Sequence, residues 1–360
     1  MTPSSSSNGQ SLVELRGLSK WFPIKKGVFP HTVGWIKAVD GVDLTIAPGR
    51  TLALVGESGC GKSTLGLSLL RLHEPTAGSI HYEGQDITHM GRAQLQPYRK
   101  KMQIIFQDPY SSLNPRLTIG ETLLEGMQVH HVGHTRQERV DRLKELLPQV
   151  GMPADVMERY PHEFSGGQRQ RLSIARALAV EPSLLVCDEA VSALDVSVQA
   201  QILNLLKDLQ RQRGLAYLFI THNLSVVEYL ADDVAVMYLG RVVEYAPTDQ
   251  LFADPKHPYT QALLKSVPPV DPEKPDLPPA LEGDVPSPAK PPSGCHFHPR
   301  CPYCFDRCPA ENPELYAVPP DRLSRCFLQD PATTEEQRKT AVRQGGAVIG
   351  HEESRQLAEG

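Results

Sequence analysis

The chain has 360 residues, of which 40% are hydrophobic and 22% charged, and its formal net charge at pH 7 is −5. This length predicts a large core domain with a further part attached to it. The acidic balance gives no sign of a nucleic-acid-binding surface, and no apolar run reaches the roughly 18 residues that indicate a membrane span. The first residues lack the basic start and apolar stretch of a secretory signal, so we expect a disordered tail over 1–11 and a cytoplasmic chain.

Alternating apolar and polar residues from Leu12 onward predict strands, and Leu52–Val55 predicts a short buried strand that leads into a glycine-rich loop and a helix. More short strands are expected over 80–106 and mainly helical structure over 112–180. A long helix is expected to end at Gly214. Later buried strands are predicted over 184–189, 216–222 and 233–245. Strands that alternate with helices predict an α/β fold with a mostly parallel, helix-covered sheet.

The loop after Val55 reads GESGCGKST and matches the pattern G-x-x-x-x-G-K-[ST]. Glycines let backbone N–H groups surround phosphates, and the helix that follows presents the positive end of its dipole there. Lys62 is expected to reach the β- and γ-phosphates, and the Ser63 hydroxyl to ligate Mg²⁺. We call this segment the phosphate loop and predict that it binds ATP through Gly56, Glu57, Ser58, Gly59, Cys60, Gly61, Lys62, Ser63 and Thr64.

Two carboxylates, Asp188 and Glu189, end the apolar strand LLVC. Asp188 is placed to hold magnesium, directly or through water, and Glu189 to polarise an attacking water molecule. Taken alone, such a strand end is more often a solvated acidic patch. Beside a phosphate loop, the catalytic interpretation is favoured.

Two further polar residues end apolar strands, Gln107 after MQIIF and His222 after YLFIT. Parallel strands bring their carboxyl ends to one crevice, so His222 could contact the γ-phosphate and Gln107 could reach Mg²⁺ or the attacking water. A lone histidine at a strand end is more often structural, and the spacing alone leaves both interpretations open.

The segment FSGGQRQR resembles the signature motif of ABC-transporter ATPases. Its serine cap and two glycines before a helix are also suited to hold an anion. In that family two subunits enclose two ATP molecules head to tail. We call Ser165, Gly166, Gly167 and Gln168 the signature segment, and the resemblance implies that it contacts the ATP of a partner subunit.

The order of the other motifs resembles the same family over about 20–250. It implies a P-loop NTPase (RecA-like) core with an antiparallel β subdomain and a helical subdomain over about 108–180. Within that resemblance Gln107 corresponds to the Q-loop, Glu189 to the catalytic glutamate and His222 to the switch histidine. Asp195 ends the SALD segment that resembles the D-loop. Phe22 corresponds to the aromatic residue that stacks on adenine, with Trp21 as the alternative.

The segment HPYT at 257–260 and the cysteine-rich segment GCHFHPRCPYCFDRC resemble the C-terminal extension of ATPases that drive dipeptide, oligopeptide and nickel importers. In some members, matching cysteines hold a [4Fe–4S] cluster, and the resemblance implies Cys295, Cys301, Cys308 and Cys326 as its ligands. Zinc is the alternative, because Cys301 and Cys304 form a C-x-x-C half-site and His296 and His298 are available. The third alternative is a set of reduced structural thiols without a metal. A structural role for the cluster is favoured over redox sensing, because a small core needs a cross-link or a metal to be stable.

The resulting domain prediction is an ATPase domain over 12–255, an extension over 256–330 with a proline-rich linker and the cysteines, and a polar, mobile tail over 331–360. The implied function is ATP hydrolysis that powers import of peptides, with nickel, glutathione or another small solute as alternatives. A non-transport ABC ATPase and a nucleotide-sensing regulator are the competing classes. The implied partners are a second ATPase subunit (a paralogue favoured over a second copy), two permease subunits and an extracytoplasmic solute-binding protein, at the cytoplasmic face of the inner membrane.

Overall fold

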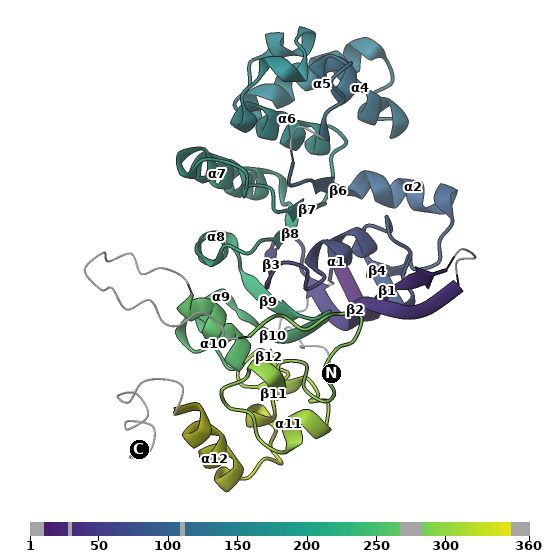
Figure 1. Ribbon diagram of the computed structural model, residues 1–360. Helices are drawn as coiled ribbons and strands as arrows, with labels where there is room; N and C mark the ends of the chain where they lie inside the picture. The colour runs from purple at the N-terminus through teal and green to yellow at the C-terminus, as the bar shows by residue number, and fades with distance from the viewer. Residues whose placement is uncertain (1–10, 28–30, 109–111, 267–282, 347–360) are drawn as a thin grey trace.

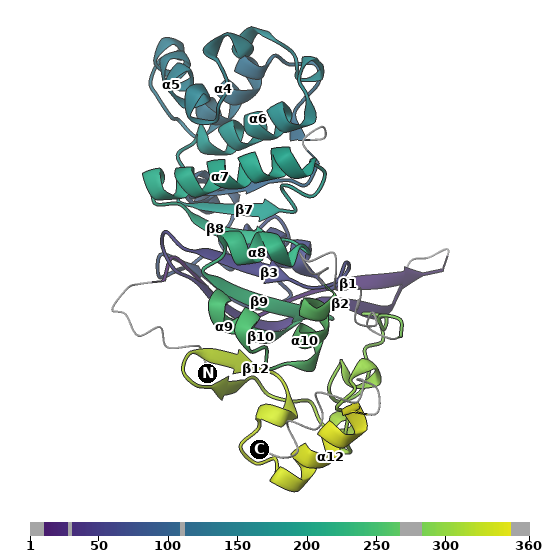
Figure 2. The ribbon, with the colours of Figure 1, turned by 90° about the vertical axis from the view of Figure 1, so that its left-hand side faces the viewer.

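The computed structural model describes residues 11–27, 31–108, 112–266 and 283–346. The predicted N-terminal tail, most of the predicted proline-rich linker and the end of the predicted C-terminal tail lie outside these residues. Figures 1 and 2 show a layered molecule, in which a helical part lies at one end and the segment after residue 283 lies at the other. The main sheet runs between these ends. No helix among the described residues is long and apolar enough to cross a membrane.

The main sheet has eight strands in the order β11-β12-β10-β9-β3-β8-β7-β6. Strands β9, β3, β8, β7 and β6 are parallel to one another, as the alternation of strands and helices predicts. Strands β10, β12 and β11 continue the sheet in antiparallel pairing. The bounds are β3 (Thr51–Val55), β6 (Met102–Ile105), β7 (Leu184–Asp188), β8 (Ala216–Ile220), β9 (Asp233–Tyr238), β10 (Arg241–Pro247), β11 (Tyr316–Val318) and β12 (Arg322–Ser324).

A second sheet has four antiparallel strands in the order β2-β1-β4-β5. Its two long strands form a hairpin in which Phe22 pairs with Ile36 and Pro23 with Trp35. The bounds are β1 (Val13–Lys26), β2 (His31–Ile46), β4 (Ala77–Tyr82) and β5 (Gln85–Asp86).

Helices cover both faces of the main sheet, and alternate residues of β8 show the two cores that result. Tyr217 and Phe219 belong to a core with the helical part, whereas Leu218 and Ile220 belong to a core with α1 and the antiparallel sheet. The helices before residue 266 are α1 (Lys62–Leu69), α2 (Arg92–Lys101), α4 (Ile119–Val129), α5 (Arg136–Gln149), α6 (Gly166–Leu178), α7 (Val196–Arg213), α8 (Leu224–Leu230), α9 (Thr248–Ala253) and α10 (Pro258–Lys265), with short 3₁₀ turns η1 (Ala154–Glu158) and η2 (Pro161–Glu163).

Local sequence fixes several helix ends. Thr118 accepts a hydrogen bond from the backbone N–H of Glu121, whose side chain returns to the Thr118 N–H, and this capping box starts α4. Gly214 adopts a left-handed conformation, with φ of 66°, and ends α7 as the sequence predicts. The sequence did not predict α2, which lies within 80–106, where short strands are expected.

The segment after residue 283 joins the main fold through β12, which pairs with β10 through Glu244 and Ser324 and through Tyr245 and Leu323. Phe297 is 1% exposed and lies in the same core cluster as Val55 and Tyr238. The sequence predicts an appendage here, yet the segment completes the main sheet and its core. Its elements are η3 (His298–Arg300), α11 (Arg307–Ala310), η4 (Phe327–Gln329) and α12 (Glu335–Gly346), and α12 occupies part of the tail that is predicted to be mobile.

A buried polar group links this core to α10. The Glu244 carboxylate on β10 is 0% exposed and accepts hydrogen bonds from the backbone N–H groups of Lys256, at 2.6 Å, and His257, at 2.9 Å. The His257 ring in turn accepts from the backbone N–H of Tyr259, at 3.1 Å, and caps α10. Burial lowers the pKa of His257 to about 3, so this ring is neutral in the folded protein at neutral pH.

Acid should therefore destabilise the protein through His257. Because the folded-state pKa lies below the unfolded value of 6.5, the unfolded chain takes up a proton that the folded chain excludes as the pH falls from 6.5 towards about 3. This group should then lower the free energy of unfolding by about 1.4 kcal/mol per pH unit in that window. Urea unfolding at pH 7.0, 6.0 and 5.0 should show a smaller loss of stability for His257→Asn, since asparagine keeps the helix cap but does not titrate. The exposed His134→Asn is the control, and equal pH dependence in wild type and His257→Asn would contradict the prediction.

Candidate active site

The phosphate loop connects β3 to α1, and two glycines in it have no room for a side chain. A Cβ on Gly61 would lie 1.9 Å from the Ala38 carbonyl oxygen, and one on Gly56 would lie 2.2 Å from the Met237 carbonyl oxygen. Both have positive φ, of 108° and 151°. The Lys62 side chain is buried, and its Nζ donates hydrogen bonds to the carbonyl oxygens of Gly56, at 2.7 Å, and Glu57, at 2.9 Å. The loop thus holds its own lysine where the motif expects phosphate binding.

Ser63 and Asp188 meet beside the start of α1. The Ser63 hydroxyl donates a hydrogen bond to Asp188 Oδ1 at 2.9 Å. Burial raises the pKa of Asp188, and the neighbouring Glu189 raises it further, against a lowering by the bond from Ser63. A hydroxyl next to a partly desolvated carboxylate is an oxygen donor set that fits Mg²⁺, because a bound cation would favour the charged carboxylate.

Glu189 contacts two of the other predicted residues. Gln107 Nε2 donates a hydrogen bond to Glu189 Oε2 at 2.9 Å, and His222 Nδ1 lies 3.2 Å from Glu189 Oε1. Glu189 itself has φ of 48°, a left-handed conformation that is uncommon for a side-chain-bearing residue and clusters at functional sites. The ends of β6, β7 and β8 therefore bring Gln107, Glu189 and His222 into contact, next to the pair of Ser63 and Asp188.

The signature segment lies apart from the phosphate loop. Ser165 caps α6 in a reciprocal pair with Gln168, whose side-chain oxygen accepts from the Ser165 N–H at 3.0 Å. A Cβ on Gly167 would lie 2.5 Å from Val198 Cγ1 of α7, so the segment packs on the first turns of α7. Residues of α6 belong to the core with the helical part, whereas Leu65 and Leu69 of α1 belong to the core on the opposite face of the main sheet. The signature segment and the helix that follows the phosphate loop therefore lie on different sides of the sheet.

The remaining predicted nucleotide contacts lie at the edges of the site. The Phe22 ring meets His73 edge-on, with ring centroids 5.5 Å apart, whereas the Trp21 ring lies under the Lys37 ammonium at 4.7 Å. Successive strand residues point to opposite faces of a sheet, so only one of the two rings can stack on a given adenine. Asp195 is the N-cap residue of α7 and lies three residues before Val198, which packs against Gly167.

Two residues beyond the predicted set contact the phosphate loop at Glu57. The Tyr259 hydroxyl oxygen accepts a hydrogen bond from the Glu57 N–H at 2.8 Å. Arg300 donates to both carboxylate oxygens of Glu57, at 2.8 and 3.0 Å. Tyr259 lies in the segment HPYT, and Arg300 lies in the segment GCHFHPRCPYCFDRC. No spacing rule indicates that these two residues reach a loop some two hundred residues earlier in the chain.

The structure does not support the predicted metal site in the cysteine-rich segment. Among the described residues, no three or more His, Cys, Asp or Glu side chains are grouped so that they could hold a metal ion. Neither the [4Fe–4S] ligand set nor the zinc alternative, with Cys301, Cys304, His296 and His298, is therefore supported by the described residues. The four thiols Cys295, Cys301, Cys308 and Cys326 are free and lie near one another; burial raises the pKa of Cys301, and the neighbouring Cys326, Cys295 and Cys308 raise it further.

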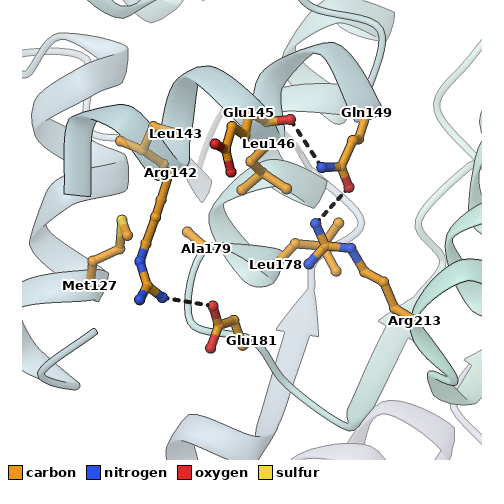
Figure 3. A pocket seen from close by; sticks show the side chains of 10 residues that line it. All are labelled: Met127, Arg142, Leu143, Glu145, Leu146, Gln149, Leu178, Ala179, Glu181 and Arg213. Carbon is orange, nitrogen blue, oxygen red and sulfur yellow. Dashed lines mark hydrogen bonds and ion pairs between the residues drawn. The ribbon is translucent and has the colours of Figure 1, made fainter. Parts of the chain in front are cut away.

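The helical part contains a cavity of about 110 Å³ that is remote from these residues. Figure 3 shows Arg142 of α5 paired with Glu181, and Arg213 at the end of α7 bonded to Gln149. Leu146 and Leu178 provide apolar lining between these charged groups. The residues that line the cavity come mainly from α5, α6 and α7.

Comparison with protein families gives two matches. A family described as ABC transporter matches residues 39–192, which include the phosphate loop, the signature segment and Glu189. A second family, described as oligopeptide/dipeptide transporter, C-terminal region, matches residues 243–308.

Two curated relatives resemble almost the whole chain. A probable peptide ABC transporter ATP-binding protein of Sinorhizobium fredii is 53% identical over 322 residues, which cover 89% of this chain and 91% of that protein. The oligopeptide transport ATP-binding protein AppF of Bacillus subtilis is 48% identical over 325 residues, which cover 89% of this chain and 98% of that protein.

Solved structures resemble about two thirds of the chain. The cbiO1 protein of Clostridium perfringens, part of an ABC transporter complex, superposes with a TM-score of 0.58 at 25% identity, covering 68% of this chain and 92% of that one. An ATP-binding cassette solved as a dimer in a post-hydrolysis state with ADP and Pi superposes with a TM-score of 0.58 at 27% identity, covering 66% of this chain and 98% of that one.

Proposed function

This chain belongs to the ATP-binding proteins of the ABC transporter family, in the group that carries the oligopeptide/dipeptide transporter C-terminal region, and on that premise we propose that it hydrolyses ATP to drive the import of peptides. Members of this family are ATPases that use ATP and Mg²⁺. The observation that carries the proposal is the contact of Glu189 with both Gln107 and His222, beside the pair of Ser63 and Asp188. This arrangement joins a carboxylate base to a phosphate loop.

In the proposed mechanism each side chain has one task. Lys62 leaves the loop carbonyls and stabilises charge on the β- and γ-phosphates. Ser63, Asp188 and Gln107 would hold Mg²⁺, which would neutralise charge on the phosphate oxygens. Glu189, which directly follows Asp188, orients the attacking water and accepts its proton. His222 stabilises the charge that builds up on the γ-phosphate.

The site becomes complete only with a second subunit. The helix α6 and the helix α1 pack on opposite faces of the main sheet, so the capped start of α6 can face a nucleotide bound to a partner. We propose that two ATPase subunits, this chain and a paralogue, close around two nucleotides, with Phe22 stacked on adenine and Asp195 at the interface. Loss of the γ-phosphate removes the bridging contacts, and the dimer reopens.

The proposed partners follow from the transporter role. The helical part, with α4, α5 and α6, transmits the closure to two permease subunits at the cytoplasmic face of the inner membrane, and the Gln107 segment acts as the hinge. A solute-binding protein delivers the peptide to the permeases from outside. The family match at residues 243–308 and the relatives that are named as peptide transporters support peptides over nickel or glutathione.

Reconstitution with candidate permease subunits tests the proposal. Vesicles that contain the complex should take up a labelled oligopeptide only when ATP and Mg²⁺ are present on the cytoplasmic side. Parallel uptake of nickel and glutathione distinguishes the substrate alternatives. ATP hydrolysis without association with any permease would favour a non-transport ABC ATPase instead.

We also propose that the four neighbouring thiols Cys295, Cys301, Cys308 and Cys326 hold a [4Fe–4S] cluster with a structural role. The proposal rests on the resemblance of the segment and on four thiols, the number that such a cluster needs. No catalytic step passes through this group.

Protein purified without oxygen should then contain about four iron and four sulfide ions per chain. Cys308→Ser should lose most of this iron, and Cys304→Ser should keep it, because Cys304 lies outside the proposed ligand set. Removal of the cluster should lower thermal stability and leave the ATPase rate of the folded protein unchanged. About one zinc ion per chain, or no metal at all, would contradict the proposal.

A further inference from the structure

The C-terminal region holds the phosphate loop at Glu57 from two directions. Arg300 donates two parallel hydrogen bonds to the Glu57 carboxylate, at 2.8 and 3.0 Å, and Tyr259 accepts one from the Glu57 backbone N–H at 2.8 Å. The side chain and the backbone of one loop residue are thus both fixed by residues that follow β10. A bidentate pair of this kind also fixes orientation, because the guanidinium and carboxylate planes must align.

Both holding residues are themselves rigidly packed. Tyr259 is 0% exposed, and its ring lies 4.7 Å from the Tyr238 ring and 5.4 Å from the Phe297 ring, centroid to centroid. The Arg300 side chain is 4% exposed and its guanidinium lies 6.0 Å from the Tyr238 ring centroid. Because packing already holds the Tyr259 and Arg300 side chains, they lose little further rotamer freedom when they contact Glu57. The contacts are therefore preorganised.

Glu57 is placed where its geometry and its charge both affect the loop. Its backbone carbonyl accepts from Lys62 Nζ at 2.9 Å, so the position of Glu57 also sets the position of the lysine. Its carboxylate is 25% exposed. An unpaired carboxylate in a loop that receives a polyphosphate would repel it, because like charges a few ångströms apart at the surface of a protein interact strongly.

We propose that Arg300, together with Tyr259, is a positioning residue for nucleotide binding, which neutralises Glu57 and holds the phosphate loop in its binding conformation. The inference rests on the proposed function and adds a role for the C-terminal region in it. Both residues contact the loop at Glu57, whereas Glu189 and His222, to which the chemical step is assigned, follow β7 and β8. The C-terminal region therefore acts on the affinity for ATP and leaves the chemical step to the strand ends.

Steady-state kinetics of the complete transporter complex, with the Arg300→Ala variant, tests this role. The KM for ATP should rise about tenfold, which corresponds to the loss of a charge-assisted contact, while kcat stays within about twofold of wild type. Adding Glu57→Gln to Arg300→Ala should restore most of the affinity, because the repelling charge is gone. Arg300→Lys should fall between the two, since it keeps the charge but loses the bidentate geometry.

Arg307→Ala is the matched control, because Arg307 lies in the same region and pairs with Asp330 at 3.0 Å without contact to the phosphate loop. It should leave the KM for ATP unchanged. Thermal unfolding of each variant separates loss of affinity from loss of folding. If Arg300→Ala does not fold, the double variant with Glu57→Gln is used for the test. An unchanged KM in Arg300→Ala, or no rescue by Glu57→Gln, overturns the inference. A wild-type complex that neither binds nor hydrolyses ATP would instead refute the proposed function.

Discussion

Replacing Glu189 with glutamine is expected to lower ATP turnover by about 10²–10⁴-fold, the usual contribution of a positioned general base. The amide has nearly the same shape as the carboxylate, so it can keep its contacts with Gln107 and His222, which join Glu189 at 2.9 and 3.2 Å. It cannot accept a proton from water. The variant should therefore bind ATP normally and stop before hydrolysis.

The stalled variant also reports on the second subunit. With ATP and Mg²⁺, Glu189→Gln should accumulate as a closed pair of subunits together with its partner, which size-exclusion chromatography with light scattering would detect. Glu228→Gln is the control, because Glu228 is exposed on α8. Wild-type turnover in Glu189→Gln would refute its assignment as the base, and a strictly monomeric, ATP-loaded variant in the presence of its partners would refute the two-subunit site.

Replacing Lys62 with alanine is expected to weaken nucleotide binding itself. Lys62 is the buried cation of the phosphate loop, and its Nζ is held at 2.7 Å from the Gly56 carbonyl oxygen, ready for transfer to a phosphate. Loss of such a contact should weaken ATP binding by about 10–100-fold, and loss of charge stabilisation should lower the rate by a further 10²–10³-fold, roughly.

Calorimetric titration with Mg-ATP measures the first effect and phosphate release the second. Lys144→Ala, on the exposed face of α5, should behave as wild type in both. Because Lys62 and Glu189 act on different steps, the two variants should differ in kind: Lys62→Ala should not form the ATP-dependent pair, whereas Glu189→Gln should accumulate it. Equal pairing in both would show that Lys62 does not bind the nucleotide.

The parts of the fold that the sequence predicts well are those in which a short segment determines its own conformation. The phosphate loop needs glycine at positions 56 and 61, where a Cβ would collide with backbone oxygens, and the motif is visible for that reason. The contact among Gln107, Glu189 and His222 follows from strand ends in a parallel sheet, which the alternation of elements predicts. Local spacing is enough for the loop, whereas for Gln107 and His222 it places the residues at strand ends and leaves a structural role open.

The parts that the sequence does not predict depend on residues far apart in the chain. Arg300 and Glu57 are separated by 243 positions, and no pattern around either residue indicates the pairing. The strands β11 and β12 have three residues each, too few for an alternation to be read. The cysteine spacing predicts a metal site, but ligand geometry depends on tertiary contacts that spacing does not determine. Among the described residues, no three or more His, Cys, Asp or Glu side chains are grouped so that they could hold a metal ion.

The pairing of Tyr245 with Leu323 also has a consequence for biosynthesis. Every nucleotide motif leaves the ribosome long before β12 is translated, and until then β10 has an unpaired edge that can recruit other strands. A nascent chain, or one truncated by a premature stop codon after residue 282, would carry every ATPase motif and still expose this edge. Quality control by chaperones and proteases should therefore eliminate such truncated chains, even though no residue of their nucleotide site has changed.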